Sequence, residues 1–126
     1  MPRNTRRPVY LNLFKIRLPV AGWLSIFHRA TGVLLFLATP FLIYLLQLSL
    51  TGPAGFDAAN QLLHSPLVSL IVVVLLWSIC HHLLAGLRYL MLDIDIGLEH
   101  PAYVYSSWTV LVAAPVFAVL LAVSLL

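Results

Sequence analysis

The stretch PLVSLIVVVLLWSICHHLLAGL, residues 66–87, runs for 22 residues without an Asp, Glu, Lys or Arg. An α-helix rises about 1.5 Å per residue, so a stretch of this length crosses a hydrocarbon core about 30 Å thick. Residues 30–50 and 101–126 are also uncharged and long enough to span a membrane. The sequence therefore predicts an all-α membrane protein with three transmembrane helices.

The composition excludes an ordinary soluble domain. Hydrophobic residues make up 62% of the 126 residues and charged residues 9%, against about 25% charged in soluble domains. No linker or repeat divides the chain, so residues 1–126 are expected to form a single membrane-anchor domain. Its spans are expected at about 22–50, 66–92 and 101–126. Residues 51–65 are expected to form an external loop, because Gly and Pro cluster there.

Basic residues cluster in the N-terminal segment, residues 1–21, before the first span. Five of the seven basic residues lie there: Arg3, Arg6, Arg7, Lys15 and Arg17. By the positive-inside rule this segment is expected to be cytoplasmic, and three spans then place the C-terminus on the outer, periplasmic side. More than twenty residues precede the first hydrophobic run, so it is not expected to be a cleaved signal peptide. A bacterial inner membrane is a simpler setting for such a chain than the mitochondrial inner membrane.

Cysteine and glycine patterns limit the cofactors that this chain can hold alone. Cys80 is its only cysteine, which excludes thiolate-bound iron–sulfur clusters and thiolate zinc sites. The sequence has no Cys-x-x-Cys-His pattern, so covalently attached haem is not expected. It also has no Gly-x-Gly-x-x-Gly fingerprint, so no flavin site is expected. The net charge of +3 arises mainly beside a membrane span, so no nucleic-acid partner is expected.

Polar residues within spans are costly, so they indicate function. The first polar group begins at Ser25. His28 and Arg29 follow it by three and four residues, so all three fall on one helical face. His28 and Arg29 could simply extend to the inner lipid headgroups. The contiguous polar face instead favours a pocket for an anionic or carbonyl-bearing ligand.

A second polar group lies in the middle span and contains His81, His82 and Arg88. Neighbouring residues on a helix point about 100° apart, so at most one of the two histidines faces the interior of a bundle. Gly86 lies one turn after His82 and leaves room for a flat or bulky group. The alternative is a packing glycine beside a hydrogen-bonded histidine.

Both polar groups fall in the inner half of the predicted bundle. A haem with His82 as an axial ligand could direct its propionates towards His28 and Arg29, because propionates need cationic partners. This arrangement is chemically coherent but does not identify the electron donor or acceptor.

Three stretches of the chain carry recognisable motifs. Residues 7–11 begin with Arg-Pro, residues 25–32 read Ser-x-x-His-Arg-x-Thr-Gly, and residues 82–88 read His-x-x-x-Gly-x-Arg, followed by Asp93. In this order and spacing they resemble the family of cytochrome b556 membrane-anchor subunits of succinate dehydrogenase, respiratory complex II. Tyr89 departs from the pattern, because members of that family often carry His or Phe after the arginine.

This resemblance implies a subunit that acts with partners. With a second small anchor subunit, it would hold the iron–sulfur subunit and the flavoprotein subunit to the membrane. Succinate is then oxidised in the flavoprotein, and FAD and the iron–sulfur clusters stay in partner subunits. The chain itself is expected to have no catalytic residue for succinate oxidation, and electrons are expected to reach ubiquinone or menaquinone near the inner face.

The resemblance also implies roles for individual residues. Ser25 and Arg29 are expected to bind the quinone, whose carbonyl suits a hydroxyl and a guanidinium as donors. His82 is expected to be one axial ligand of the iron of haem b, with the other ligand supplied by the partner anchor subunit. His28 and Arg29 are expected to contact the haem propionates, and Asp93 to lie near a proton route from the aqueous side.

Three other interpretations fit the same residues. A small transport or channel subunit could line an ion path with His28, Arg29, His82 and Arg88. A passive anchor could keep the motifs as packing features without any haem. A haem could also be bound within this chain alone, with His28 and His82 as its two axial ligands.

Overall fold

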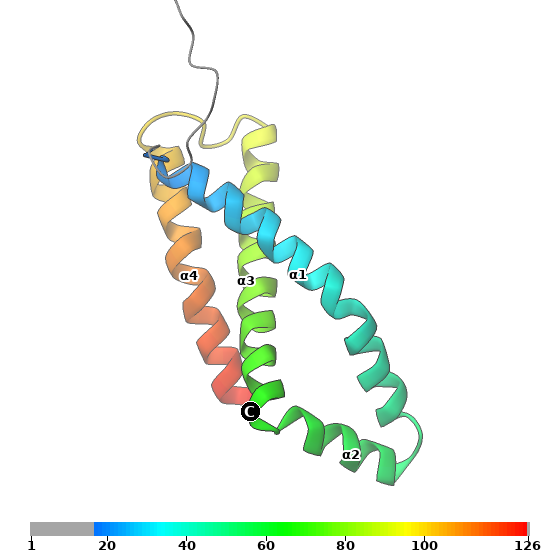
Figure 1. Cartoon of the computed structure of the whole chain (residues 1–126). Coiled ribbons are helices and arrows are strands. Elements are labelled where there is room, and N and C mark those ends of the chain that lie inside the picture. Colours follow the sequence, from blue (N-terminus) through cyan, green and yellow to red (C-terminus); the bar gives the residue numbers. More distant parts are fainter. Residues whose placement is uncertain (1–16, 126) are drawn as a thin grey trace, which may run out of the picture.

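The structure is a computed structural model that describes residues 17–125 (Figure 1). Within this range it contains no strand. Its helices are α1 (Val20–Ser49), α2 (Pro53–Leu63), α3 (Pro66–Asp93) and α4 (Ala102–Leu125). The helices α1, α3 and α4 are long and apolar enough to cross a membrane. The prediction of an all-α membrane protein with three transmembrane helices is therefore confirmed.

Residues 1–16 lie outside the described part of the chain. Most of the basic N-terminal cluster and the Arg-Pro start at residues 7–11 fall in that segment. The side of the membrane that each end of the molecule faces therefore stays a prediction from charge.

Prolines mark the beginnings of three helices. Pro19 precedes α1 in an extended conformation, with φ −64° and ψ 160°, and Pro53 and Pro66 are the first residues of α2 and α3. At the first helical position a proline sacrifices no helical hydrogen bond, and its ring fixes a helical φ in advance. The same residue type that breaks a helix internally therefore starts two helices here.

The prediction of a loop over residues 51–65 is wrong, because most of this segment forms α2. Gly52 has a φ of 116° and turns the chain, and Pro53 then begins the helix. Phe56 and Ala59 lie three residues apart and line a hollow against the end of α1. Ala59 is buried, and its packing against α1 stabilises a helix that the glycine and proline content did not predict.

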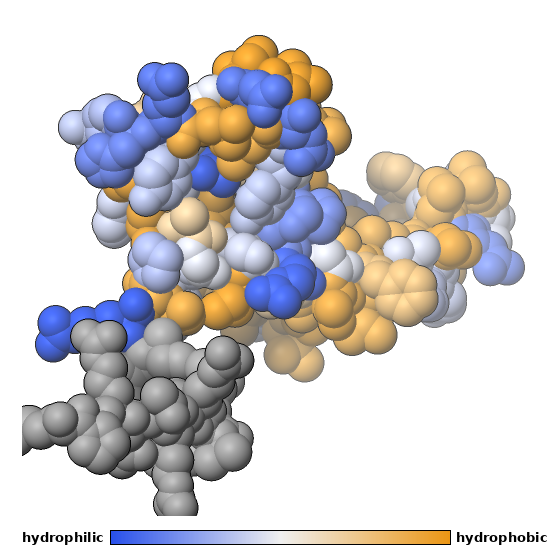
Figure 2. Space-filling model, turned by 90° about the horizontal axis from the view of Figure 1, so that it is seen from above, coloured by the Kyte–Doolittle hydropathy of each residue, from blue (hydrophilic) through white to orange (hydrophobic). Residues whose placement is uncertain are grey.

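The helices α3 and α4 pack side by side, and α1 crosses them obliquely (Figure 1). The start of α1 contacts both helices, its far end diverges, and α2 connects that far end back to α3. The start of α1, the end of α3 and the start of α4 therefore meet at one end of the molecule, here named the polar end. Figure 2 looks onto this end and shows hydrophilic residues gathered there, whereas the parts behind are mostly hydrophobic.

The interior between the spans is built largely from small side chains. Ala85 of α3 and Ala114 of α4 are fully buried, and Leu24 of α1 packs with Ala85 and Val110. Small residues let helix backbones approach closely in membrane proteins, where lipid is as apolar as the side chains. Large apolar side chains instead point outward, as Phe36 does at 76% exposed, which suits contact with lipid or with the helices of a partner.

Candidate functional site

The two polar groups of the sequence meet where α1 crosses α3. The imidazole rings of His28 and His82 stack, with their centroids 4.2 Å apart and their planes 9° from parallel. Two glycines flank the pair: a Cβ on Gly32 would lie 2.9 Å from Cε1 of His82, and a Cβ on Gly86 would lie 3.6 Å from Nε2 of His28. Only the first distance is shorter than a real Cβ contact, so the position of His82 requires Gly32.

The backbone of α1 orients the His82 ring. Nδ1 of His82 lies 3.1 Å from the carbonyl oxygen of His28. A carbonyl only accepts, so Nδ1 carries the hydrogen and donates it, and Nε2 keeps its lone pair. Within residues 17–125 Nε2 has no hydrogen-bond partner, and it is not among the buried unpaired atoms. An imidazole that donates one N–H to a carbonyl and presents its other nitrogen is the usual form of a metal-binding histidine.

Thr31 supports the same geometry from α1. Its hydroxyl shares its hydrogen between the carbonyl oxygens of Phe27 and His28, at 2.8 and 2.9 Å. The same oxygen lies 3.4 Å from Nδ1 of His82, and the side chain is fully buried. The Thr-Gly pair of the first motif therefore packs against the histidine of the second motif.

The hypothesis of a haem ligated by both His28 and His82 is wrong in this structure. Two axial ligands of one iron lie on opposite sides of a porphyrin and point their nitrogens at each other. Here the two rings lie face to face, 4.2 Å apart. Their lone pairs lie in nearly parallel ring planes, and no porphyrin fits between the two faces. His28 therefore does not supply a second axial ligand opposite His82.

Ser25 and Arg29, the two residues expected to bind quinone, differ in their surroundings. Nε of Arg29 donates to the backbone carbonyl of Ser25 at 3.3 Å, and the side chain is exposed. The hydroxyl of Ser25 donates to no carbonyl in the described chain. Every other Ser or Thr between residues 17 and 125 donates to a backbone carbonyl. Among the described serines and threonines, Ser25 is therefore the one whose hydroxyl is left available for another acceptor or donor.

Ser25 opens into a hollow of about 360 Å³ at the polar end, between α1, α3 and α4. This polar-end hollow is lined by Ala21, Ser25, Arg88, Tyr89, Leu92, Leu98 and Tyr103. Arg29 is not among the lining residues, so Ser25 shares this hollow with Arg88, whereas Arg29 contacts the backbone carbonyl of Ser25.

Arg88 is buried, at 6% exposed, and α4 holds its guanidinium. Nε donates to the hydroxyl of Ser106 and Nη2 to the carbonyl oxygen of Tyr103, both at 2.9 Å. The hydroxyls of Ser106 and Ser107 also donate to that carbonyl. The third span showed no motif in the sequence, yet a Ser-Ser pair at its start and an arginine within the preceding span are signals that could have paired the two helices.

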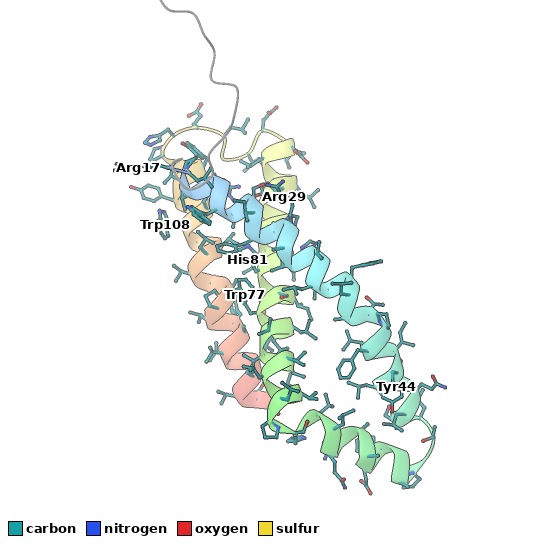
Figure 3. The ribbon with its side chains drawn as sticks, in the orientation of Figure 1. Arg17, Arg29, Tyr44, Trp77, His81 and Trp108 are labelled. Carbon is teal, nitrogen blue, oxygen red and sulfur yellow. The ribbon has the colours of Figure 1, made fainter. Side chains whose placement is uncertain are left out.

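The neighbouring histidines occupy different surroundings, as their spacing predicts. His81 is 1% exposed and packs against the rings of Phe27 and Trp77, with centroids 6.0 and 5.6 Å away. Figure 3 shows the labelled His81 and Trp77 following each other along α3. Nε2 of His81 and the hydroxyl of Tyr89 are buried and lack a hydrogen-bond partner among the described residues. His82, with its accessible nitrogen, is therefore the better candidate ligand of the two.

Asp93 lies apart from these side chains. It is the last residue of α3 and is exposed at the polar end. Tyr89, one turn earlier, makes an edge-to-face contact with His28, with ring centroids 5.2 Å apart. Along α3, Tyr89 therefore lies between the exposed carboxylate of Asp93 and the stacked pair of His28 and His82.

Comparison with known proteins places this chain in a family. Residues 3–122 match the family model described as "Succinate dehydrogenase/Fumarate reductase transmembrane subunit". The succinate dehydrogenase cytochrome b556 subunit of Coxiella burnetii is 36% identical over 118 residues, covering 93% of this chain and 94% of the relative. The subunit of the same name from Paracoccus denitrificans is 35% identical, covering 90% and 88%. The cytochrome b560 subunit of Reclinomonas americana is 35% identical, covering 76% and 70%. The chain therefore belongs to the family of succinate dehydrogenase and fumarate reductase transmembrane subunits.

Proposed function

We propose that this chain is the haem b-binding and quinone-site anchor of a succinate:quinone oxidoreductase in a bacterial inner membrane. The observation that carries the proposal is the geometry of His82. Its Nδ1–H is directed to the carbonyl of His28, and its Nε2 is left accessible. The cytochrome names of the relatives support haem as the group that this nitrogen binds.

The residues around His82 suit a haem. His82 would supply one axial nitrogen, and a partner anchor subunit would supply the other, because His28 stacks on His82 and cannot do so. His28 and Arg29 would contact the propionates, as cationic or hydrogen-bonding groups at the same end of α1. When bound, haem b supplies a one-electron carrier within the membrane. The carbonyl of His28 and the absent side chain of Gly32 keep the imidazole in place.

Ser25 and Arg29 would bind the substrate, ubiquinone or menaquinone. A hydroxyl and a guanidinium donate hydrogen bonds to a carbonyl oxygen and stabilise the negative charge that develops there as electrons arrive. The hydroxyl of Ser25, which bonds to no group in residues 17–125 and lines the polar-end hollow, supports this role. Asp93, exposed at the end of α3, would deliver protons from the aqueous side.

The rest of the enzyme would come from partner subunits. Succinate oxidation belongs to the flavoprotein subunit, and the iron–sulfur subunit would deliver electrons to the polar end of this chain. A second anchor subunit would cover part of the exposed apolar surface. The Ser25, His28 and His82 cluster lies at the end predicted to face the cytoplasm, where those soluble subunits would bind.

The test is a dithionite-reduced minus oxidised spectrum of the assembled complex with His82→Leu. We expect the wild type to show an α-band near 556 nm, the wavelength in the relatives' name, and the variant to lose it. His64→Leu is the control, because His64 is exposed at the other end of the molecule. An unchanged band in His82→Leu would refute its role as ligand. A wild-type complex without haem would favour a passive anchor or a transport subunit.

A further inference from the structure

Arg88 is a buried cation without a counter-charge in the groups that hold it. It is 6% exposed, and its two partners, the hydroxyl of Ser106 and the carbonyl of Tyr103, are both neutral. A charged side chain in a membrane span costs several kcal/mol. Burying it is favourable only if every donor finds an acceptor, and a guanidinium has five.

One end of this guanidinium is unused. Within residues 17–125 Nη1 has no hydrogen-bond partner, and it is not among the buried unpaired atoms, so it retains access to the surface. Arg88 lines the polar-end hollow, and so does Ser25, whose hydroxyl also has no partner among the described residues. Two accessible donors, one from α1 and one from α3, therefore line the same hollow.

The remaining walls of the hollow are mainly apolar or aromatic, including Leu92, Leu98 and Tyr103. A few fixed donors against apolar walls are typical of a pocket for a largely apolar ligand that carries an acceptor oxygen. Arg29 does not line this hollow, and its exposed side chain donates to its own helix.

We propose that Arg88, together with Ser25, binds an acceptor oxygen of a ligand in the polar-end hollow, and that Ser106 positions the guanidinium for this contact. The proposal rests on the proposed function and adds to it a second cation, anchored by α4. The acceptor chemistry has two possible sources, the carbonyl of the quinone and the carboxylate of a haem propionate. Both oxygens accept charge-assisted hydrogen bonds from a guanidinium.

The test uses the assembled complex with Arg88→Gln, Ser106→Ala, Ser25→Ala and a matched control, Ser107→Ala. Ser106 and Ser107 both donate to the carbonyl of Tyr103, but only Ser106 accepts from Arg88. The readouts are KM and kcat for a soluble short-chain quinone, the haem midpoint potential, and succinate oxidation with an artificial acceptor.

If the source is the quinone, Ser106→Ala raises KM for quinone about three- to tenfold, the size of one lost hydrogen bond. Arg88→Gln raises KM by more, in the direction of Ser25→Ala, and Ser107→Ala leaves KM unchanged. If the source is a propionate, Arg88→Gln and Ser106→Ala shift the haem midpoint potential and leave KM for quinone unchanged. Either result supports the proposal, because both require an acceptor oxygen at Arg88.

Wild-type KM and midpoint potential in both Arg88→Gln and Ser106→Ala would overturn the proposal. If Arg88→Gln does not assemble, Ser106→Ala alone decides, because it removes one neutral partner and leaves the arginine in place. One outcome refutes this proposal alone: the wild-type complex reduces quinone and contains haem, and the Arg88 and Ser106 variants have the same KM and midpoint potential as the wild type. A wild-type complex that lacks both refutes the proposed function instead.

Discussion

Gly32 lies against the ring of His82, and the absence of a side chain there decides where the imidazole can sit. A Cβ at this position would lie 2.9 Å from Cε1 of His82. The ring is also held by the carbonyl of His28. A displaced ring would lose that hydrogen bond, so Gly32 acts on the candidate ligand through its position.

We expect Gly32→Ala to lower haem affinity about tenfold or more, the usual cost of disturbing the partners of a metal ligand. Gly22→Ala is the matched control, because it lies on the same helix and its Cβ would meet only Leu18 and Pro19, at an ordinary 3.6 Å. Haem content per complex and the low-spin electron paramagnetic resonance signal measure the difference. Equal haem content and identical signals in Gly32→Ala and the wild type would contradict the role given to Gly32.

Sequence motifs predicted which residues form the candidate site better than they predicted the contacts of those residues. His28 and His82 could be grouped before the structure was known, because a polar side chain within a membrane span is costly and requires a polar partner. The partners of Arg88 could not, because one is the backbone carbonyl of Tyr103, which no side-chain pattern reveals. The stacking of the two histidines also depends on the crossing of α1 over α3, which hydropathy does not fix.

The three spans could be predicted from uncharged length alone, whereas α2 could not. Gly52 and Pro53 indicate a turn in a one-dimensional reading, and Gly52 does turn the chain with a φ of 116°. Pro53, however, is the first residue of a helix, and that helix exists because its apolar side packs on the end of α1. The signal that was available was the helical spacing of Phe56 and Ala59.

The contact of α2 with α1 makes a prediction at Gly55. A Cβ there would overlap the backbone carbonyl oxygen of Leu48 and the side chain of Thr51, and the carbonyl cannot move aside cheaply. We expect Gly55→Ala to destabilise the subunit by about 1–3 kcal/mol, the range for overpacking. The haem spectrum should not change, because α2 follows the far end of α1, away from His28 and His82.

Thermal denaturation of the assembled complex measures this effect, with Ala58→Ser as control. Ala58 lies on the same helix and is exposed. An unchanged melting temperature in Gly55→Ala would show that α2 does not pack on α1 as described. A loss of haem in the same variant would show that the two ends of the molecule are coupled.

Charge is unevenly distributed over the whole molecule. The arginines among residues 17–125, which are Arg17, Arg29 and Arg88, all lie towards the polar end, as do Asp93, Asp95 and Glu99. Asp57 of α2 is the one described residue with a formal charge at the other end. The candidate ligand, the free hydroxyl of Ser25 and the anchored arginine therefore share the end that the positive-inside rule places in the cytoplasm. The proposed electron transfer from soluble subunits would require this orientation.

Cysteine labelling tests the orientation directly. Cys80 is the only cysteine and is buried within α3, so the unaltered chain should take up no label and serves as the control. Asp57 and Glu99 are exposed at opposite ends of the molecule. With a membrane-impermeant maleimide, we expect Asp57→Cys to be labelled on intact spheroplasts and Glu99→Cys only after the membrane is opened. The opposite result would turn the polar end outward, away from a cytoplasmic electron donor, and the proposed electron path from the soluble subunits would then be physically blocked.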